Sequence, residues 1–107
     1  MKKYLVIEEP IETRTTDVIA EAYEKGFQNG YYKVIAETEN LEEARKILAK
    51  HTITVSPVES FYDVKRYEAY LVYIEALDWD EDLEEWEPDL DSLEFAEIVN
   101  PETDEEG

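Results

Sequence analysis

The chain has 107 residues, no cysteine, and a formal net charge of −19. This length predicts a single domain, and the lack of cysteine excludes disulfides, thiolate catalysis and cysteine zinc sites. The longest apolar run, residues 69–74, is far below the roughly 20 residues of a membrane span, and the N-terminus is too short for a secretory signal. We therefore expect a cytoplasmic protein with no membrane partner.

The first elements along the chain are a short strand and a helix. The apolar sequence of residues 4–7 predicts a short buried strand, and Pro10 marks its end. Apolar residues recur at helical spacing over 15–26, with Thr15 or Thr16 as the N-cap and Gly26 after the last turn. An alternative stays open, because the sequence of 18–21 reappears at 34–37. If both copies are strands, residues 16–38 form a hairpin around Asn29-Gly30.

Residues 31–38 predict a second strand, which begins after the Asn29-Gly30 turn. A helix is predicted over 41–50, because Asn40 suits the N-cap and Glu43 follows at capping-box spacing. Residues 52–56 alternate as a short strand that Pro57 ends, and residues 57–66 predict a loop. The longest strand is predicted over 67–77, where both faces are apolar or aromatic, as in a central strand.

The composition changes from Asp78 onward. Residues 78–97 include 11 acidic side chains, yet tryptophan, leucine and phenylalanine interrupt them, unlike a plain acidic tail. Leu83 and Trp86 are three positions apart, a spacing that predicts one helical turn before Pro88. Residues 90–99 fit either a helix or an edge strand. The last residues, 100–107, are expected to be disordered.

Together these elements predict an α+β fold: a small, mostly antiparallel sheet with two helices on one face, followed by a very acidic C-terminal segment. The core is expected to span residues 1–77. The acidic, aromatic-containing segment 78–99 then docks on this core or extends it.

No motif fixes a metal site, a cofactor or catalysis, and low-affinity calcium binding by the many carboxylates is a third, less favoured hypothesis. Residues 78–82 have the D-x-D-x-D opening of a calcium loop, but Leu83 replaces its glycine and Asp89 its final glutamate. His51, the only histidine, is explained by the C-terminal end of the predicted helix, where its charge is favoured. No serine lies in a nucleophile motif, and no glycine loop suits a phosphate. We expect a protein that is not an enzyme.

The charge is divided unevenly along the chain. Residues 1–66 contain 12 acidic and 10 basic side chains, a net charge of −2, whereas residues 67–107 contain 17 acidic and no basic ones, a net charge of −17. A surface of this kind attracts cationic partners and repels nucleic acid. Direct nucleic-acid binding is therefore excluded, since it needs clusters of Lys and Arg.

The charge itself is then the candidate function, because rows of carboxylates can stand in for the phosphates of a nucleic acid. In charge, size and the stretch Asp78 to Glu97, the chain is similar to small phage-type inhibitors that imitate DNA, such as anti-restriction and anti-CRISPR proteins. That similarity implies a decoy that blocks a basic nucleic-acid-binding protein, for example a nuclease or a restriction or CRISPR component. The expected partner-binding residues are Asp78, Trp79, Asp80, Glu81, Asp82, Glu84, Glu85, Trp86, Glu87, Asp89 and Asp91.

The alternative is a generic protein–protein interaction domain or accessory subunit that binds through aromatic residues. Tyr70, Trp79 and Trp86 are then apolar anchors inside a charged rim. This alternative allows a homodimer. The two hypotheses predict different responses to salt, because screening weakens only the charge-driven contact.

Overall fold

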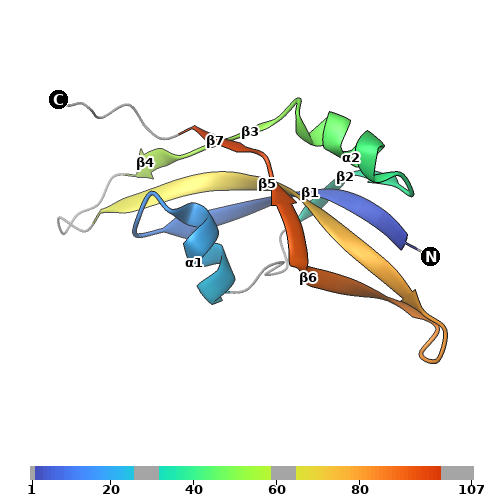
Figure 1. The fold of residues 1–107 in the computed structure, drawn as a ribbon. Coiled ribbons are helices and arrows are strands. Elements are labelled where there is room, and N and C mark those ends of the chain that lie inside the picture. Colours follow the sequence, from blue (N-terminus) through green and yellow to red (C-terminus); the bar gives the residue numbers. More distant parts are fainter. Residues whose placement is uncertain (1, 26–31, 59–64, 100–107) are drawn as a thin grey trace.

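The computed structural model describes residues 2–25, 32–58 and 65–99 (Figure 1). Its elements in chain order are β1 (Lys2–Thr13), α1 (Val18–Lys25), β2 (Lys33–Thr38), α2 (Leu41–Leu48), β3 (Thr52–Thr54), β4 (Ser56–Val58), β5 (Arg66–Asp80), β6 (Glu85–Phe95) and β7 (Glu97–Val99). No helix in these three ranges is long and apolar enough to cross a membrane.

The two longest strands form the centre of a mostly antiparallel sheet. β1 pairs with β5 without interruption from Lys2 opposite Asp78 to Thr13 opposite Tyr67. β2 lies on the outer side of β1, and the other edge of β5 is shared by β4 and β6. β3 and β7 form a separate parallel pair. The predicted α+β class with a mostly antiparallel sheet is therefore confirmed.

The two helices lie on opposite faces of this sheet, so the expectation that they share one face was wrong. Successive residues of β5 point to opposite faces. α2 reaches the face of Ile74, because Arg45 of α2 binds Glu94, which pairs with Ile74. α1 reaches the other face, where its Tyr23 contacts Phe95, which in turn contacts Tyr73. Figure 1 shows α1 below the sheet and α2 above it, on the side of β3 and β7.

Coverage on both sides explains why β5 is buried continuously from Leu71 to Leu77. An alternating strand would be buried on one face only. The core also contains a polar group, because the hydroxyl of the buried Tyr73 donates to Oε1 of the buried Glu9 at 2.7 Å. A buried hydroxyl without such a bond would destabilise the fold.

Both predicted helices are present, with shorter limits than expected. Asn40 caps α2 as predicted, accepting from the backbone N–H of Glu43 at 3.1 Å. For α1 the predicted threonine caps were wrong, because Asp17 accepts from the N–H of Ala20 at 3.2 Å. The alternative hairpin over 16–38 is excluded, since residues 18–25 are helical. Gly26 and the Asn29-Gly30 turn lie outside the described residues.

The C-terminal half of the chain differs most from the expected structure. The helical turn expected before Pro88 is wrong, because residues 85–95 form β6. Proline is tolerated there, since β6 has a strand partner on one side only within the described chain and an edge strand can do without one donor. The open choice for 90–99 is resolved as strand, in β6 and β7. Part of the predicted 57–66 loop pairs with β5 as β4; its residues 59–64 and the tail 100–107 are outside the described ranges.

Candidate protein-interaction surface

The end of β5, the start of β6 and the turn between them form a hairpin, residues 78–89, that projects from the body (Figure 1). The Asp80 carboxylate holds the turn, because it accepts from the backbone N–H groups of Asp82 and Leu83 at 2.9 and 3.2 Å. In the D-x-D-x-D stretch of residues 78–82, Asp80 is therefore engaged in backbone hydrogen bonds of the turn. Among the residues that the structure describes, no group of three or more His, Asp or Glu side chains could hold a metal ion.

The strand register separates the hairpin side chains into two faces. Asp78 lies opposite Glu87, and Asp80 lies opposite Glu85. Directly opposite residues of an antiparallel pair point to the same side. These four side chains and Asp89, which pairs with Ala76, therefore form one surface. We call Asp78, Asp80, Glu85, Glu87 and Asp89 the carboxylate face.

The opposite side of the hairpin is aromatic. Trp79 pairs with Trp86 across the strands, with ring centroids 5.3 Å apart at an angle of 65°. The Lys3 ammonium lies 4.5 Å above the Trp86 ring, a cation–π contact. Edge-to-face packing of this kind stabilises a strand pair by about 1 kcal/mol. It holds together two strands whose other face is repulsive.

Like charges across strands destabilise a hairpin, and the carboxylate face contains two such pairs. The negative charge of Asp80 raises the pKa of Glu87 above its ordinary value. Desolvation, a hydrogen bond with Asp80 and the charges of Glu85 and Asp78 contribute in the same direction. Within the described residues, the only ion pair on this face is Lys2 to Asp78, with Nζ 3.4 Å from Oδ1. The repulsion is therefore largely uncompensated.

A bulge separates the hairpin from the rest of β6. Between the pairs Ala76–Asp89 and Ile74–Glu94, β5 advances two residues while β6 advances five. The extra length bends β6, and the Asp89 carboxylate accepts from the N–H of Asp91 at 3.1 Å within this bend. Beyond it, Glu94 binds the Arg45 guanidinium through two bonds of 2.9 Å, which ties β6 to α2.

The structure thus distributes the predicted partner-binding residues over several surfaces. Five form the carboxylate face, the two tryptophans lie on the opposite side, Glu81, Asp82 and Glu84 belong to the turn, and Asp91 lies in the bulge. Tyr70, the third expected anchor, is on β5 well away from the hairpin. In the described hairpin, the carboxylate face and the two tryptophans therefore lie on opposite sides.

The sequence does contain a signal for this hairpin. Residues 78–80 read Asp-Trp-Asp and residues 85–87 read Glu-Trp-Glu, so acid–Trp–acid appears twice around a four-residue turn. The contributions of Lys2 and Lys3 have no comparable signal, because they depend on the pairing of β1 with β5. No family model, no curated protein and no solved structure matches this chain.

Proposed function

We propose that this protein binds a basic, nucleic-acid-binding protein through the carboxylate face and blocks it as a decoy. One observation carries the proposal. Two like-charged pairs, Asp78–Glu87 and Asp80–Glu85, are held directly across a projecting hairpin at the expense of stability. A cationic cleft would relieve this repulsion on binding. Enzymes that act on nucleic acid have such clefts, and we place the encounter in the cytoplasm.

The spacing of the charges favours imitation of one nucleic-acid strand. From the level of Asp89 to that of Asp80 the hairpin rises about 13 Å at roughly 3.3 Å per residue. This length carries five carboxylates, whereas one strand of a duplex has about four phosphates over the same distance. Both strands together would have about eight. The carboxylate face therefore has the linear charge density of a single strand.

The test compares two variants of equal net charge. The first carries Lys at Asp78, Glu85, Glu87 and Asp89, four members of the carboxylate face, and keeps Asp80 because that residue holds the turn. The second carries Lys at the exposed Glu24, Glu39, Glu43 and Glu97. Proteins captured from a lysate on the immobilised wild type at low salt are eluted with a salt gradient and purified. Each is then assayed for displacement of labelled single-stranded and duplex DNA.

The wild type and the second variant should displace DNA, and the first variant should not. The displacement should weaken steeply as salt rises, since screening acts on exposed charges. Equal displacement by the two variants would show that total charge, and not the carboxylate face, is responsible. Failure of the wild type to displace DNA from any captured protein would reject the decoy.

The second candidate is an interaction domain or accessory subunit with an aromatic contact surface, including a homodimer. It is favoured by the exposure of large apolar side chains: Tyr70 is 62% exposed, Leu83 59% and Trp79 36%. Burial of such groups drives association with little dependence on salt. Light scattering at low and high salt tests this candidate. A net charge of −19 opposes self-association when it is unscreened, so an aromatic dimer should form at high salt, where charge-driven binding to a basic protein weakens.

A further inference from the structure

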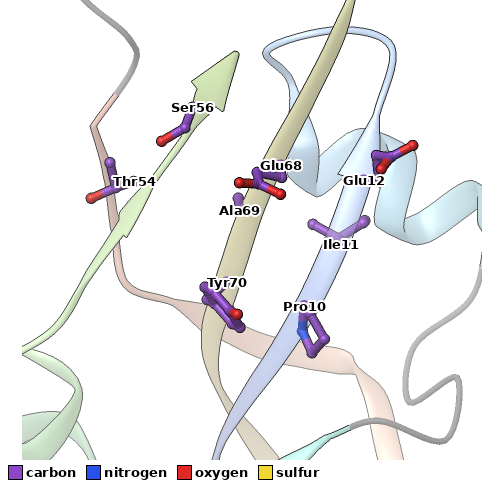
Figure 2. A pocket seen from close by; sticks show the side chains of 8 residues that line it. All are labelled: Pro10, Ile11, Glu12, Thr54, Ser56, Glu68, Ala69 and Tyr70. Carbon is purple, nitrogen blue, oxygen red and sulfur yellow. The ribbon is translucent and has the colours of Figure 1, made fainter. Parts of the chain in front are cut away.

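A hollow of about 400 Å³ lies across β1 and β5, beside a gap at one edge of β5 (Figure 2). β4 pairs with β5 only as far as Glu68, and β6 begins to pair with it at Tyr73. β3, which precedes β4, turns away to pair with β7. The part of β5 around Ala69 and Tyr70 is therefore left without a partner strand on this side, within the part of the chain that the structure describes.

The lining of the hollow combines an aromatic ring, a carboxylate and hydroxyl groups. Tyr70 lies directly opposite Pro10, and their side chains form an apolar floor. Glu68 lies directly opposite Ser56, so its carboxylate and that hydroxyl share one side of the sheet. Thr54, at the end of β3, adds a second hydroxyl, and Figure 2 shows Thr54 and Ser56 on the segment across from the part of β5 that carries Glu68 and Tyr70.

The charge in this hollow is not balanced internally. Glu12, the other acidic residue of the lining, forms an ion pair with Arg66. Glu68 forms no ion pair with any residue in the described ranges, although Arg66 and Lys65 are close in sequence. An exposed carboxylate beside the open face of a tyrosine has the chemistry that recognises a cation with a flat surface.

We propose that the hollow binds an arginine side chain from an extended basic segment of a partner protein. The planar guanidinium stacks on the Tyr70 ring, and its fork of N–H donors reaches the Glu68 carboxylate and the hydroxyls of Ser56 and Thr54. The aliphatic stem lies on Pro10. Lysine fits less well, because its compact ammonium can neither stack nor donate through two parallel bonds.

This site does not rest on the decoy function. Glu68 and Asp78 are ten residues apart on β5, which corresponds to about 33 Å along the strand. The carboxylate face attracts any cation through its charge, whereas the hollow selects by shape. A preference for arginine over lysine therefore reports on the hollow alone.

The experiment uses ¹⁵N-labelled full-length protein and three acetylated, amidated pentapeptides of four glycines around a central arginine, lysine or citrulline. Amide shifts are followed during titration. The arginine peptide should shift Thr54, Ser56, Glu68 and Tyr70 and bind about threefold or more tighter than the lysine peptide there. The citrulline peptide, which has similar shape but no charge, should leave these amides unchanged.

Variants at exposed positions keep the test independent of folding. Tyr70→Ala and Glu68→Gln should each weaken the arginine peptide about tenfold at the hollow, since each removes one of its two main contacts. Tyr70→Phe should bind normally, because the ring face is kept. Glu97→Gln removes one exposed charge elsewhere and should have no effect.

Three results would overturn the proposal. Equal affinity of the arginine and lysine peptides at the hollow would show that only net charge is sensed. Shifts confined to residues 78–91 would place all the binding on the hairpin. Shifts of Tyr70 that depend on protein concentration without any peptide would show that a second copy of the chain occupies the hollow. The four-lysine hairpin variant should still bind the arginine peptide in the hollow, which separates this site from the decoy function.

Discussion

Carboxylates towards the two ends of β5 are held in opposite ways. Near the start of β5, Glu21 of α1 accepts from the backbone N–H groups of Arg14 and Thr15 at 2.8 and 3.1 Å. Desolvation opposes its ionisation, but these two bonds, the charge of Lys25 and the Thr15 hydroxyl together lower its pKa. At the far end of β5, the charge of Asp80 raises the pKa of Glu87. The anionic form of Glu21 is therefore stabilised by the fold, whereas that of Glu87 is destabilised.

The two regions use charge in different ways. Around α1, and where Arg45 joins Glu42 and Glu94, acids are paired with donors, so charge supports the fold. On the carboxylate face, acids are placed opposite acids, and the tryptophan pair and turn bonds maintain the hairpin. The acids bound to these donors stabilise the body. The hairpin gives up some stability for a concentrated negative surface.

Burial produces the greatest difference in stability between substitutions in the two regions. Leu71 is fully buried in the middle of β5, whereas Leu83 in the hairpin turn is 59% exposed. Leu71→Ala should reduce the free energy of unfolding by about 3 kcal/mol, because it removes core contacts and leaves a cavity. Leu83→Ala should change it by no more than about 0.5 kcal/mol. Urea unfolding measures both, and similar losses in the two variants would contradict the assignment of the core.

A smaller loss of stability is expected at α2, which Arg45 ties to β6 beyond the bulge. Asn40→Ala removes the side-chain oxygen that accepts from the N–H of Glu43, and should destabilise the protein by about 1 kcal/mol. Asn40→Asp keeps an acceptor and should unfold at nearly the wild-type urea concentration. An equal loss in both variants would mean that the amide group of Asn40 has another role.

These regions also differ in how far the sequence predicts them. The buried part of β5 and the cap of α2 follow from local rules, because a run of apolar β-formers and an Asn-x-x-Glu pattern carry the signal themselves. The hairpin was missed because Asp and Glu are poor strand formers, and Pro88 resembles a helix stop. The placement of the helices on both faces depends on how distant segments pack, which residues 15–26 and 41–50 do not encode by themselves.

The same limit applies to the candidate surfaces. The acidic residues of 78–91 were identifiable from composition, but their division into a carboxylate face and an aromatic face needs the register of β5 and β6. The hollow at Tyr70 combines residues from β1, β3, β4 and β5. No spacing along one segment indicates such a site.

A smaller effect is expected in the hairpin turn. Glu84 has φ of 53°, in the left-handed region that favours glycine. Glu84→Gly should stabilise the protein by about 0.5 kcal/mol, because relief of the Cβ contact exceeds the added flexibility of the unfolded chain. Glu84→Gln removes the same charge but keeps the strain. If both variants gain equally in urea unfolding, charge repulsion and not backbone geometry limits the turn.

The smallest effect, and the most direct measure of the contrast, is the response to acid. A carboxyl whose pKa is raised on folding contributes stability below its unfolded pKa and loses it as pH rises through the folded value. A carboxyl whose pKa is lowered contributes stability above its unfolded pKa and loses it as pH falls through the folded value. The unfolded reference is 4.5 for both Glu87 and Glu21. As acid is added, protonation of Glu87 therefore begins to relieve the repulsion in the hairpin above pH 4.5. The stabilisation that ionised Glu21 provides near α1 is lost below pH 4.5.

Single substitutions separate the two contributions. Between pH 7 and about 5, Glu87→Gln should gain less stability than the wild type, because the repulsion is already absent. Between about pH 4.5 and 3, Glu21→Gln should lose less than the wild type, since its favourable anion is already missing. Both differences should be small and decrease with salt, because these groups are exposed to solvent. Urea midpoints at each pH measure both differences. If the two variants differ from the wild type with the same sign, the charges of the hairpin and of α1 act alike, and the distinction between a region that uses charge to fold and one that presents charge to a partner is wrong.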